Sequence, residues 1–321
     1  MEIGSFIGLD LKNSGEYYSG DRNIARLNSA RAGIYHACRL YNCKSIHIPY
    51  YLCPTVKNFL ESKNIHVSFY FISDEFEPLN LRQDDDHAIL LVNYFGILSN
   101  SKIKMLAKQF ENVIIDNSSA FFSNPVDGCY NVYSPRKFLG VPDGCYVIGK
   151  DANQSTELYN YDYSSLTASF LLKRLEFSLE ETYKERMKNE QRIDESDVLK
   201  MSKVTRALLN NIDYSSIKLK RGKNILKAHD LFKKLNLLDP LKFIDNSCIP
   251  MVYPLVIEKI DLTDKLVKNK IFVGRLWNIV LKDVPENSFE AWLSRYLVPI
   301  PIDQRYGIRE LTYIYRKIVD L

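Results

Sequence analysis

Two short apolar segments, AILLVN (88–93) and NVIID (112–116), constrain the fold most strongly because one helix length of chain separates them. Apolar runs that lack polar alternation are typical of strands buried on both faces of a parallel sheet. The intervening residues 101–110 have helical periodicity. A strand, a crossover helix and a second strand form the repeating unit of parallel α/β folds.

The same alternation extends to both sides of this unit. We expect helices at 29–41 and 54–63, and strands at 45–49, 66–72, 130–133 and 145–148. The sequence therefore predicts an α/β fold with a mostly parallel central sheet flanked by helices.

The second half of the chain has a different pattern. Residues 164–234 are helical and charged, and the Asp239–Pro240 step is a plausible linker. Beyond it we expect a smaller α+β domain, with strands at 251–257, 271–273 and 298–300, and helices at 262–268, 285–296 and 308–319. We place a large cofactor-binding domain at 1–235 and a small C-terminal domain at 240–321, because 321 residues suffice for two domains.

Charge and composition exclude several classes of protein. The formal charge of +4 is too small for a nucleic-acid groove. The densest basic run contains Lys218, Lys220, Arg221 and Lys223, and we interpret it as a solvated helix face. No apolar stretch is long enough for a membrane span, and no signal peptide is evident. Six cysteines without a CxxC pair, and without metal-like spacing to the five histidines, favour a reduced cytoplasmic protein with no metal site.

Candidate ligand-binding residues follow the predicted strands, since ligands of open α/β sheets bind at the carboxyl ends of the strands. Asp116 ends an apolar run, where it either caps the next turn or pairs with a cationic ligand atom. Lys137 is either a solvated surface lysine or a Schiff-base nucleophile. Ser29 begins a helix whose N-terminus can bind a phosphate, although a plain N-cap is equally compatible with it. A phosphate site, a carboxylate and a lysine are the groups that pyridoxal phosphate requires.

Four blocks in this order resemble the DegT-type sugar aminotransferases, which are pyridoxal-phosphate enzymes of fold type I. They are LNSARAGIY (27–35), IPYYLCPTV (48–56), VIIDNSSA (113–120) and VYSPRKFLGVPDGCYV (132–147). Weaker similarity continues through Met201 and Ser202, GRLW (274–277) and PIDQRY (301–306). The resemblance implies a fold type I aminotransferase with a small C-terminal α+β domain.

The resemblance also implies roles for individual residues. Lys137 would hold the cofactor and shuttle the proton, and Asp116 would pair with the pyridine nitrogen. The remaining cofactor-binding candidates are Ser29, Ala30, Arg31 and Ser134 at the phosphate, Tyr51 over the ring and Ser119 beside it. The substrate candidates are Asn93, Tyr94, Arg305 and Tyr306.

Four positions depart from the family pattern. Ala30 and Arg31 replace a glycine and a threonine, Ser119 replaces a glutamine or histidine, and Val132 replaces a serine whose place Ser134 can take. Whether Arg31 contacts phosphate or closes a salt bridge is open at this point.

The main functional hypothesis is transfer of an amino group from an amino acid, with glutamate favoured, to a nucleotide-linked keto-sugar for surface polysaccharides. By family analogy the enzyme would be a homodimer with shared active sites. One alternative is another pyridoxal-phosphate reaction, namely decarboxylation, dehydration or transamination of a small non-nucleotide substrate. The other is a catalytically silent ligand-binding relative.

Overall fold

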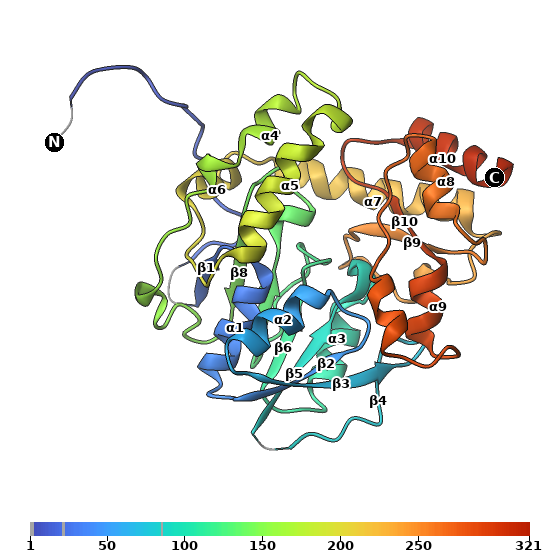
Figure 1. The fold of residues 1–321 in the computed structure, drawn as a ribbon, viewed down its shortest axis with the longest axis horizontal. Helices are drawn as coiled ribbons and strands as arrows, with labels where there is room; N and C mark the ends of the chain where they lie inside the picture. Colours follow the sequence, from blue (N-terminus) through green and yellow to red (C-terminus); the bar gives the residue numbers. More distant parts are fainter. Residues whose placement is uncertain (1–2, 21–22, 85) are drawn as a thin grey trace.

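The computed structural model describes residues 3–20, 23–84 and 86–321. A large α/β part surrounds an eight-stranded sheet, and a smaller part contains a two-stranded antiparallel sheet (Figure 1). An extended N-terminal segment leads away from the body of the molecule (Figure 1).

The large sheet has the strand order β1-β8-β7-β6-β5-β2-β3-β4. Its strands are β1 (Ile24–Leu27), β2 (Ser45–Pro49), β3 (His66–Ile72), β4 (Pro78–Leu79), β5 (His87–Val92), β6 (Val113–Asp116), β7 (Tyr130–Tyr133) and β8 (Cys145–Ile148). The five strands from β7 to β3 are mutually parallel, whereas β8, β1 and β4 join by antiparallel pairing. The predicted mostly parallel sheet is confirmed, and β1 is a strand that the sequence pattern did not reveal.

Helices of the large part follow their strands as a doubly wound fold requires. They are α1 (Ala30–Leu40), α2 (Pro54–Ser62), α3 (Asn100–Ala107), α4 (Ser169–Lys173), α5 (Leu179–Glu195) and α6 (Lys203–Leu209). The first of them, α1, packs against β6, β7 and β8. This contact is close because α1 carries Gly33 where a Cβ atom would lie 2.7 Å from Cys145 Sγ and 3.0 Å from Val147 Cγ2.

The smaller part is built from α7 (Tyr214–Phe232), β9 (Val252–Val256), α8 (Leu262–Lys268), α9 (Phe289–Tyr296), β10 (Leu297–Pro301) and α10 (Ile308–Asp320). Ile225, Ala228 and Phe232 of α7 share one apolar core with β9, β10 and α10. Packing thus groups α7 with the C-terminal elements, although α7 precedes the expected boundary at 235–240.

One predicted strand of the smaller part is wrong. Residues 271–273 form no strand, because their amides bond locally: Ile271 N–H donates to Leu266 O at the end of α8, and Val273 N–H donates to Ile271 O. Ile271 and Val273 are nevertheless buried, which explains their apolar character. Among the described residues, none of the helices is long and apolar enough to cross a membrane.

Gly33 provides a test of the α1 contact. We expect Gly33→Ala to lower the free energy of unfolding by roughly 1–3 kcal/mol, because the added methyl group overpacks a closed interface. The matched control is Gly222→Ala in α7, where a Cβ atom meets nothing within 4 Å. This control should leave stability unchanged or raise it by up to about 1 kcal/mol. Equal denaturant midpoints for the two variants would contradict the packing argument.

Candidate functional site

The candidate site lies at the sheet edge where β5, β6 and β7 end and α1 begins. Three backbone hydrogen bonds join the loops at this edge: Asn93 N–H to Asp116 O (3.0 Å), Asn117 N–H to Val132 O (2.8 Å) and Gly144 N–H to Asn28 O (2.8 Å). Because β1 runs in the same direction as β7, the N-terminus of α1 is held at this edge as well. The blocks 27–35, 113–120 and 132–147 thus meet in space with the loop that follows β5.

Asp116 occupies the carboxyl end of β6, as predicted, and is 7% exposed. Its Oδ1 accepts a hydrogen bond of 2.8 Å from Ser118 N–H. The turn-capping role is therefore present in the structure. The hydrogen bond from Ser118 uses only Oδ1 of the carboxylate, so a ligand could still bind at Oδ2.

Two buried polar atoms beside Asp116 have no hydrogen-bond partner among the described residues, namely Asn93 Oδ1 and Ser118 Oγ. Asn93 Nδ2, in contrast, donates to Asn117 Oδ1 at 3.2 Å. Unpaired buried oxygen atoms are costly unless a ligand or water satisfies them. The oxygen atoms around Asp116 thus fit a polar ligand that carries a hydrogen-bond donor, as the protonated ring nitrogen of pyridoxal phosphate does.

Ser119 follows this turn and is half-buried. Its carbonyl oxygen would lie 2.2 Å from a Cβ atom at Gly96, whose φ of +75° is also accessible mainly to glycine. Gly96 therefore permits the close approach of the loops after β5 and β6. This contact fixes Ser119 against the loop that follows β5.

The N-terminus of α1 is capped by Ser29, whose side chain accepts from Ala32 N–H. Ala30, half-buried, is the first residue of the helix. Arg31 is directed elsewhere: its guanidinium forms a 2.6 Å salt bridge with Asp194 and donates to Ile193 O. The salt-bridge alternative thus describes the observed contacts of Arg31. The backbone amides at the start of α1 are the groups left at this end that could bind a phosphate.

Lys137 is an exposed residue at the end of a single 3₁₀ turn, Pro135–Lys137, directly after β7. Ser134, at the start of this turn, is buried. Arg136 forms a 2.6 Å salt bridge with Glu190 of α5. No ion pair of Lys137 is found among the described residues, so its ammonium group is available at the edge that carries Asp116.

The segment that follows Lys137 is anchored by a residue outside the predicted site, Asp143. This fully buried carboxylate accepts hydrogen bonds from Ser202 N–H (2.8 Å), Ser202 Oγ (2.6 Å) and Thr205 Oγ1. Ser202 is also the N-cap of α6. Asp143, the acidic residue of the sequence PDG (142–144), therefore ties the segment 137–144, called the lysine loop below, to α6.

The smaller part contacts the same loop through Gln304 and Arg221. Gln304 Nε2 donates to Phe138 O at 2.8 Å, and its Oε1 accepts from Arg221 Nε at 3.1 Å. The Arg221 guanidinium lies 4.5 Å from the centroid of the Phe138 ring and donates to Pro250 O and Met251 O. Burial lowers the pKa of Arg221 to about 10. Arg221 is only 1% exposed, so its assignment to a solvated helix face is wrong.

Tyr51 and Tyr94 are almost fully buried. Tyr51 OH donates to Leu276 O at 3.1 Å, and Tyr94 OH donates to Tyr51 O at 2.8 Å. Burial raises the pKa of both phenols above the ordinary value. Both hydroxyl groups therefore serve to join the loops after β2 and β5 to the chain before Trp277.

Arg305 and Tyr306 lie in the segment that carries Gln304. Arg305 forms a two-pronged salt bridge with Asp303, at 2.8 and 2.9 Å, and its guanidinium lies 5.1 Å from the centroid of the Tyr306 ring. The backbone oxygen of Tyr306 accepts from Asn224 Nδ2 at 3.0 Å. Arg305 is exposed and follows Gln304, which contacts the lysine loop, but Asp303 already neutralises its charge.

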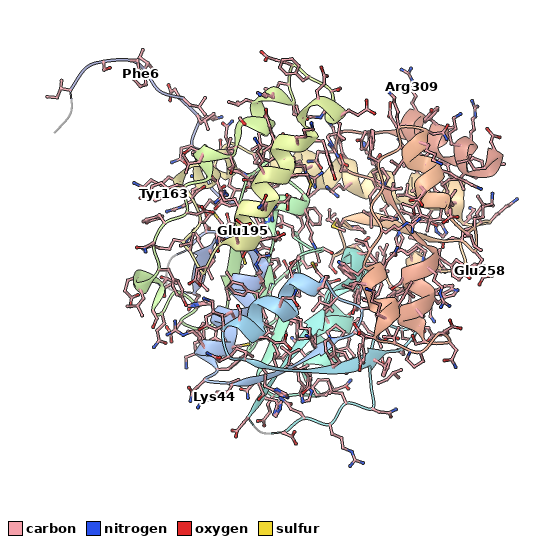
Figure 2. All side chains as sticks on the ribbon, in the orientation of Figure 1. Phe6, Lys44, Tyr163, Glu195, Glu258 and Arg309 are labelled. Carbon is pink, nitrogen blue, oxygen red and sulfur yellow. The ribbon has the colours of Figure 1, made fainter. Side chains whose placement is uncertain are left out.

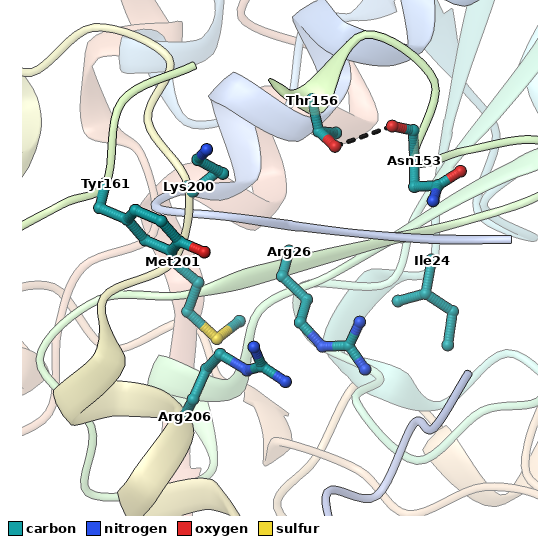
Figure 3. A pocket seen from close by; sticks show the side chains of 8 residues that line it. All are labelled: Ile24, Arg26, Asn153, Thr156, Tyr161, Lys200, Met201 and Arg206. Carbon is teal, nitrogen blue, oxygen red and sulfur yellow. Dashed lines mark hydrogen bonds between the residues drawn. The ribbon is translucent and has the colours of Figure 1, made fainter. Parts of the chain in front are cut away.

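A separate cavity of about 160 Å³ lies near β1 and α6, lined by Arg26, Lys200 and Arg206 among others (Figure 3). Glu16 holds the two arginines there, with its oxygens 2.7 Å from Arg26 Nε and 3.0 Å from Arg206 Nε. The predicted site residues do not line this cavity. Its polarity is explained by this ion-pair network.

The anchor of the lysine loop can be tested by Asp143→Ala. Loss of three hydrogen bonds to a buried carboxylate should lower the free energy of unfolding by roughly 2–4 kcal/mol. Asp230→Ala is the control, because its side chain is 75% exposed on α7 and should have little effect. Chemical denaturation measures both. Similar values for the two variants would show that Asp143 is not an anchor.

Comparison with known proteins adds evidence at the level of the fold. No family model matches the chain, and no curated protein matches it. Solved structures do match. Helicobacter pylori PseC, an aminotransferase involved in the biosynthesis of pseudoaminic acid, is 15% identical with a TM-score of 0.60, covering 92% of this chain and 86% of its own.

Two further structures agree with this result. The sugar aminotransferase CalS13 from Micromonospora echinospora is 11% identical, with a TM-score of 0.60 over 92% of this chain and 87% of its own. NtdA from Bacillus subtilis, solved with bound cofactor PMP, is 12% identical, with a TM-score of 0.61 over 92% and 72%. The chain therefore has the fold of DegT-type sugar aminotransferases.

Proposed function

We propose that this chain is a pyridoxal-phosphate-dependent aminotransferase. In this proposal it transfers an amino group from an amino acid, with glutamate favoured, to a nucleotide-linked keto-sugar for surface polysaccharide synthesis in the cytoplasm. One observation carries the proposal: Asp116, the N-terminus of α1 and the Lys137 turn meet at one edge of a sheet of this fold. The bound PMP of NtdA supports the choice of cofactor.

The residues at this edge would divide the binding of the cofactor. The amides at the start of α1 would bind the phosphate, helped by the helix dipole and by buried Ser134. The Asp116 carboxylate would hold a proton on the pyridine nitrogen, since a nearby negative charge favours the protonated form. Bound pyridoxal phosphate supplies an electron sink for negative charge at the donor α-carbon.

Lys137 would carry the covalent attachment and the proton transfer. Its Nζ would remove the proton from the α-carbon of the amino donor and return it at the cofactor carbon, and the second half of the reaction would reverse this transfer on the acceptor. An exposed lysine on a short turn can move between these positions, whereas the loop behind it is fixed by Asp143 and Gln304. The substrate candidates are Asn93, whose buried Oδ1 has no partner among the described residues, together with Tyr94, Arg305 and Tyr306.

We also propose a homodimer with shared active sites. Large apolar side chains are exposed between residues 158 and 187, including Leu166 (81%) and Leu175 (85%). The extended N-terminal segment exposes Phe6 (89%), which points away from the body in Figure 2, and Tyr163 lies at the surface near its base. Exposed apolar surface of this kind marks interaction sites. We therefore propose that a second copy of the chain binds to this exposed apolar surface near the lysine loop.

Single-turnover chemistry tests the function. With pyridoxal phosphate and glutamate, the protein should release one equivalent of 2-oxoglutarate, and a nucleotide-linked keto-sugar should then regenerate the starting absorption spectrum. Lys137→Ala should abolish both steps, whereas Lys150→Ala should retain them. Failure with every amino donor would contradict the aminotransferase. Turnover with only small non-nucleotide acceptors would favour the alternative substrate class.

Sedimentation equilibrium tests the dimer. The wild-type chain should sediment as a dimer, and Leu166→Lys combined with Leu175→Lys should shift it toward a monomer, because two charges would be buried in the interface. Leu219→Lys on α7 is a control, since Leu219 is also exposed (60%) but lies outside this surface. A wild-type protein that stays monomeric at micromolar concentration would overturn the proposal.

A further inference from the structure

A second cluster of ligating side chains lies away from the cofactor edge. His47 lies in β2, and His87 is the first residue of the neighbouring β5. The register pairs Ser45 with His87, so that His47 and His87 are diagonal neighbours on one face of the sheet. Their rings stack with centroids 4.8 Å apart and an interplanar angle of 24°.

Asp84 completes this cluster from the connection between β4 and β5. His87 N–H donates to Asp84 O at 3.0 Å, which folds the loop back toward the start of β5. Asp84 Oδ2 lies 3.9 Å from His87 Nδ1. One potential ligand atom from each of the three side chains lies within 4.8 Å of the other two.

Both imidazole rings have a nitrogen atom that is buried but unsatisfied. His47 Nε2 and His87 Nδ1 have no hydrogen-bond partner among the described residues. Burial, and then the neighbouring His87, lower the pKa of His47. Two imidazoles with unsatisfied buried nitrogens side by side are an arrangement that a cation would stabilise.

We propose that His47, His87 and Asp84 bind one divalent transition-metal ion, with zinc as the best match. Two imidazoles and one carboxylate are ligands that Zn²⁺ accepts, whereas Mg²⁺ and Ca²⁺ prefer all-oxygen sites. Bond lengths of about 2.0–2.2 Å require the ligand atoms to lie roughly 3.3 Å apart in a tetrahedral site. A small shift of the exposed Asp84 side chain would bring its Oδ2 from 3.9 Å to this distance from His87 Nδ1. A water molecule would fill the fourth position.

This metal site lies at the opposite end of the strands from the proposed cofactor site, so its role would be separate from catalysis. His87 begins β5, whereas Asn93 and Asp116 follow the opposite, carboxyl ends of β5 and β6. Lys44, which immediately precedes β2, marks the lower rim of the molecule in Figure 2, and the β4–β5 connection lies at this rim in Figure 1. A bound ion would therefore pin the β4–β5 loop onto the sheet and stabilise the fold.

Calorimetric titration of the full, untagged chain with ZnCl₂ tests the proposal after dialysis against a chelator. We expect one ion per chain and a higher thermal midpoint when zinc is present, since a ligand of the native state stabilises it. The double variant His47→Gln, His87→Gln should lose the binding, and Asp84→Asn should weaken it by about tenfold or more. Asp84→Asn also guards against misfolding, because Asp84 is on an exposed loop.

His66→Gln is the matched control, because it removes an exposed histidine from the neighbouring β3 and keeps all three ligands. This variant should bind zinc with wild-type affinity. Undiminished binding in the double variant, or an equal loss in His66→Gln, would overturn the assignment. Absence of zinc binding in the folded wild-type chain would overturn it as well.

Discussion

The close packing of α1 on the sheet is the constraint on which the rest of the candidate site depends. Gly33 allows the helix to approach Cys145, Val147 and Val132 of β8 and β7. This approach sets the N-terminus of α1 beside the ends of β6 and β7. Any side chain at this position would push the helix outward, and the amides at the start of α1, which we propose bind the phosphate, would move away from Asp116.

A second set of contacts fixes the lysine loop from three directions. Asp143 connects it to α6, Asn189 of α5 donates to Pro142 O at 2.7 Å, and Gln304 reaches it from the smaller part. The loop is thus rigid behind Lys137, whereas Lys137 itself is exposed. Such a combination suits the proton transfer that we propose for Lys137.

The sequence predicted the structure best where burial determines both the apolar pattern of a segment and its secondary structure. The runs that became β5 and β6 are apolar because helices cover both faces, so their strand character and parallel pairing could be predicted. The short β1 could not be recognised, because Arg26 interrupts its apolar pattern and its pairing with β8 is non-local. Residues 271–273 have the composition of a strand, but local turns satisfy their amides.

The candidate site was predictable in part for similar reasons. Asp116 stood out as a carboxylate ending an apolar strand, and Ser29 as an N-cap. The contacts of Arg31 with Asp194, of Arg221 with Phe138, and of Asp143 with Ser202 join residues that are far apart in the chain. Composition and residue spacing do not reveal which distant residues will be partners in the folded chain. The paired state of Arg305 likewise emerges only from its geometry with Asp303.

A crystal structure of the full chain grown with pyridoxal phosphate tests the central claim most directly. We predict that the phosphate lies at the amides of Ala30 and Arg31 near Ser134, that the pyridine nitrogen faces Asp116, and that density is continuous to Lys137 Nζ. A cofactor bound elsewhere, for example in the cavity lined by Arg26, Lys200 and Arg206, would contradict the account. So would a site near Asp116 that stays without cofactor at saturating concentration.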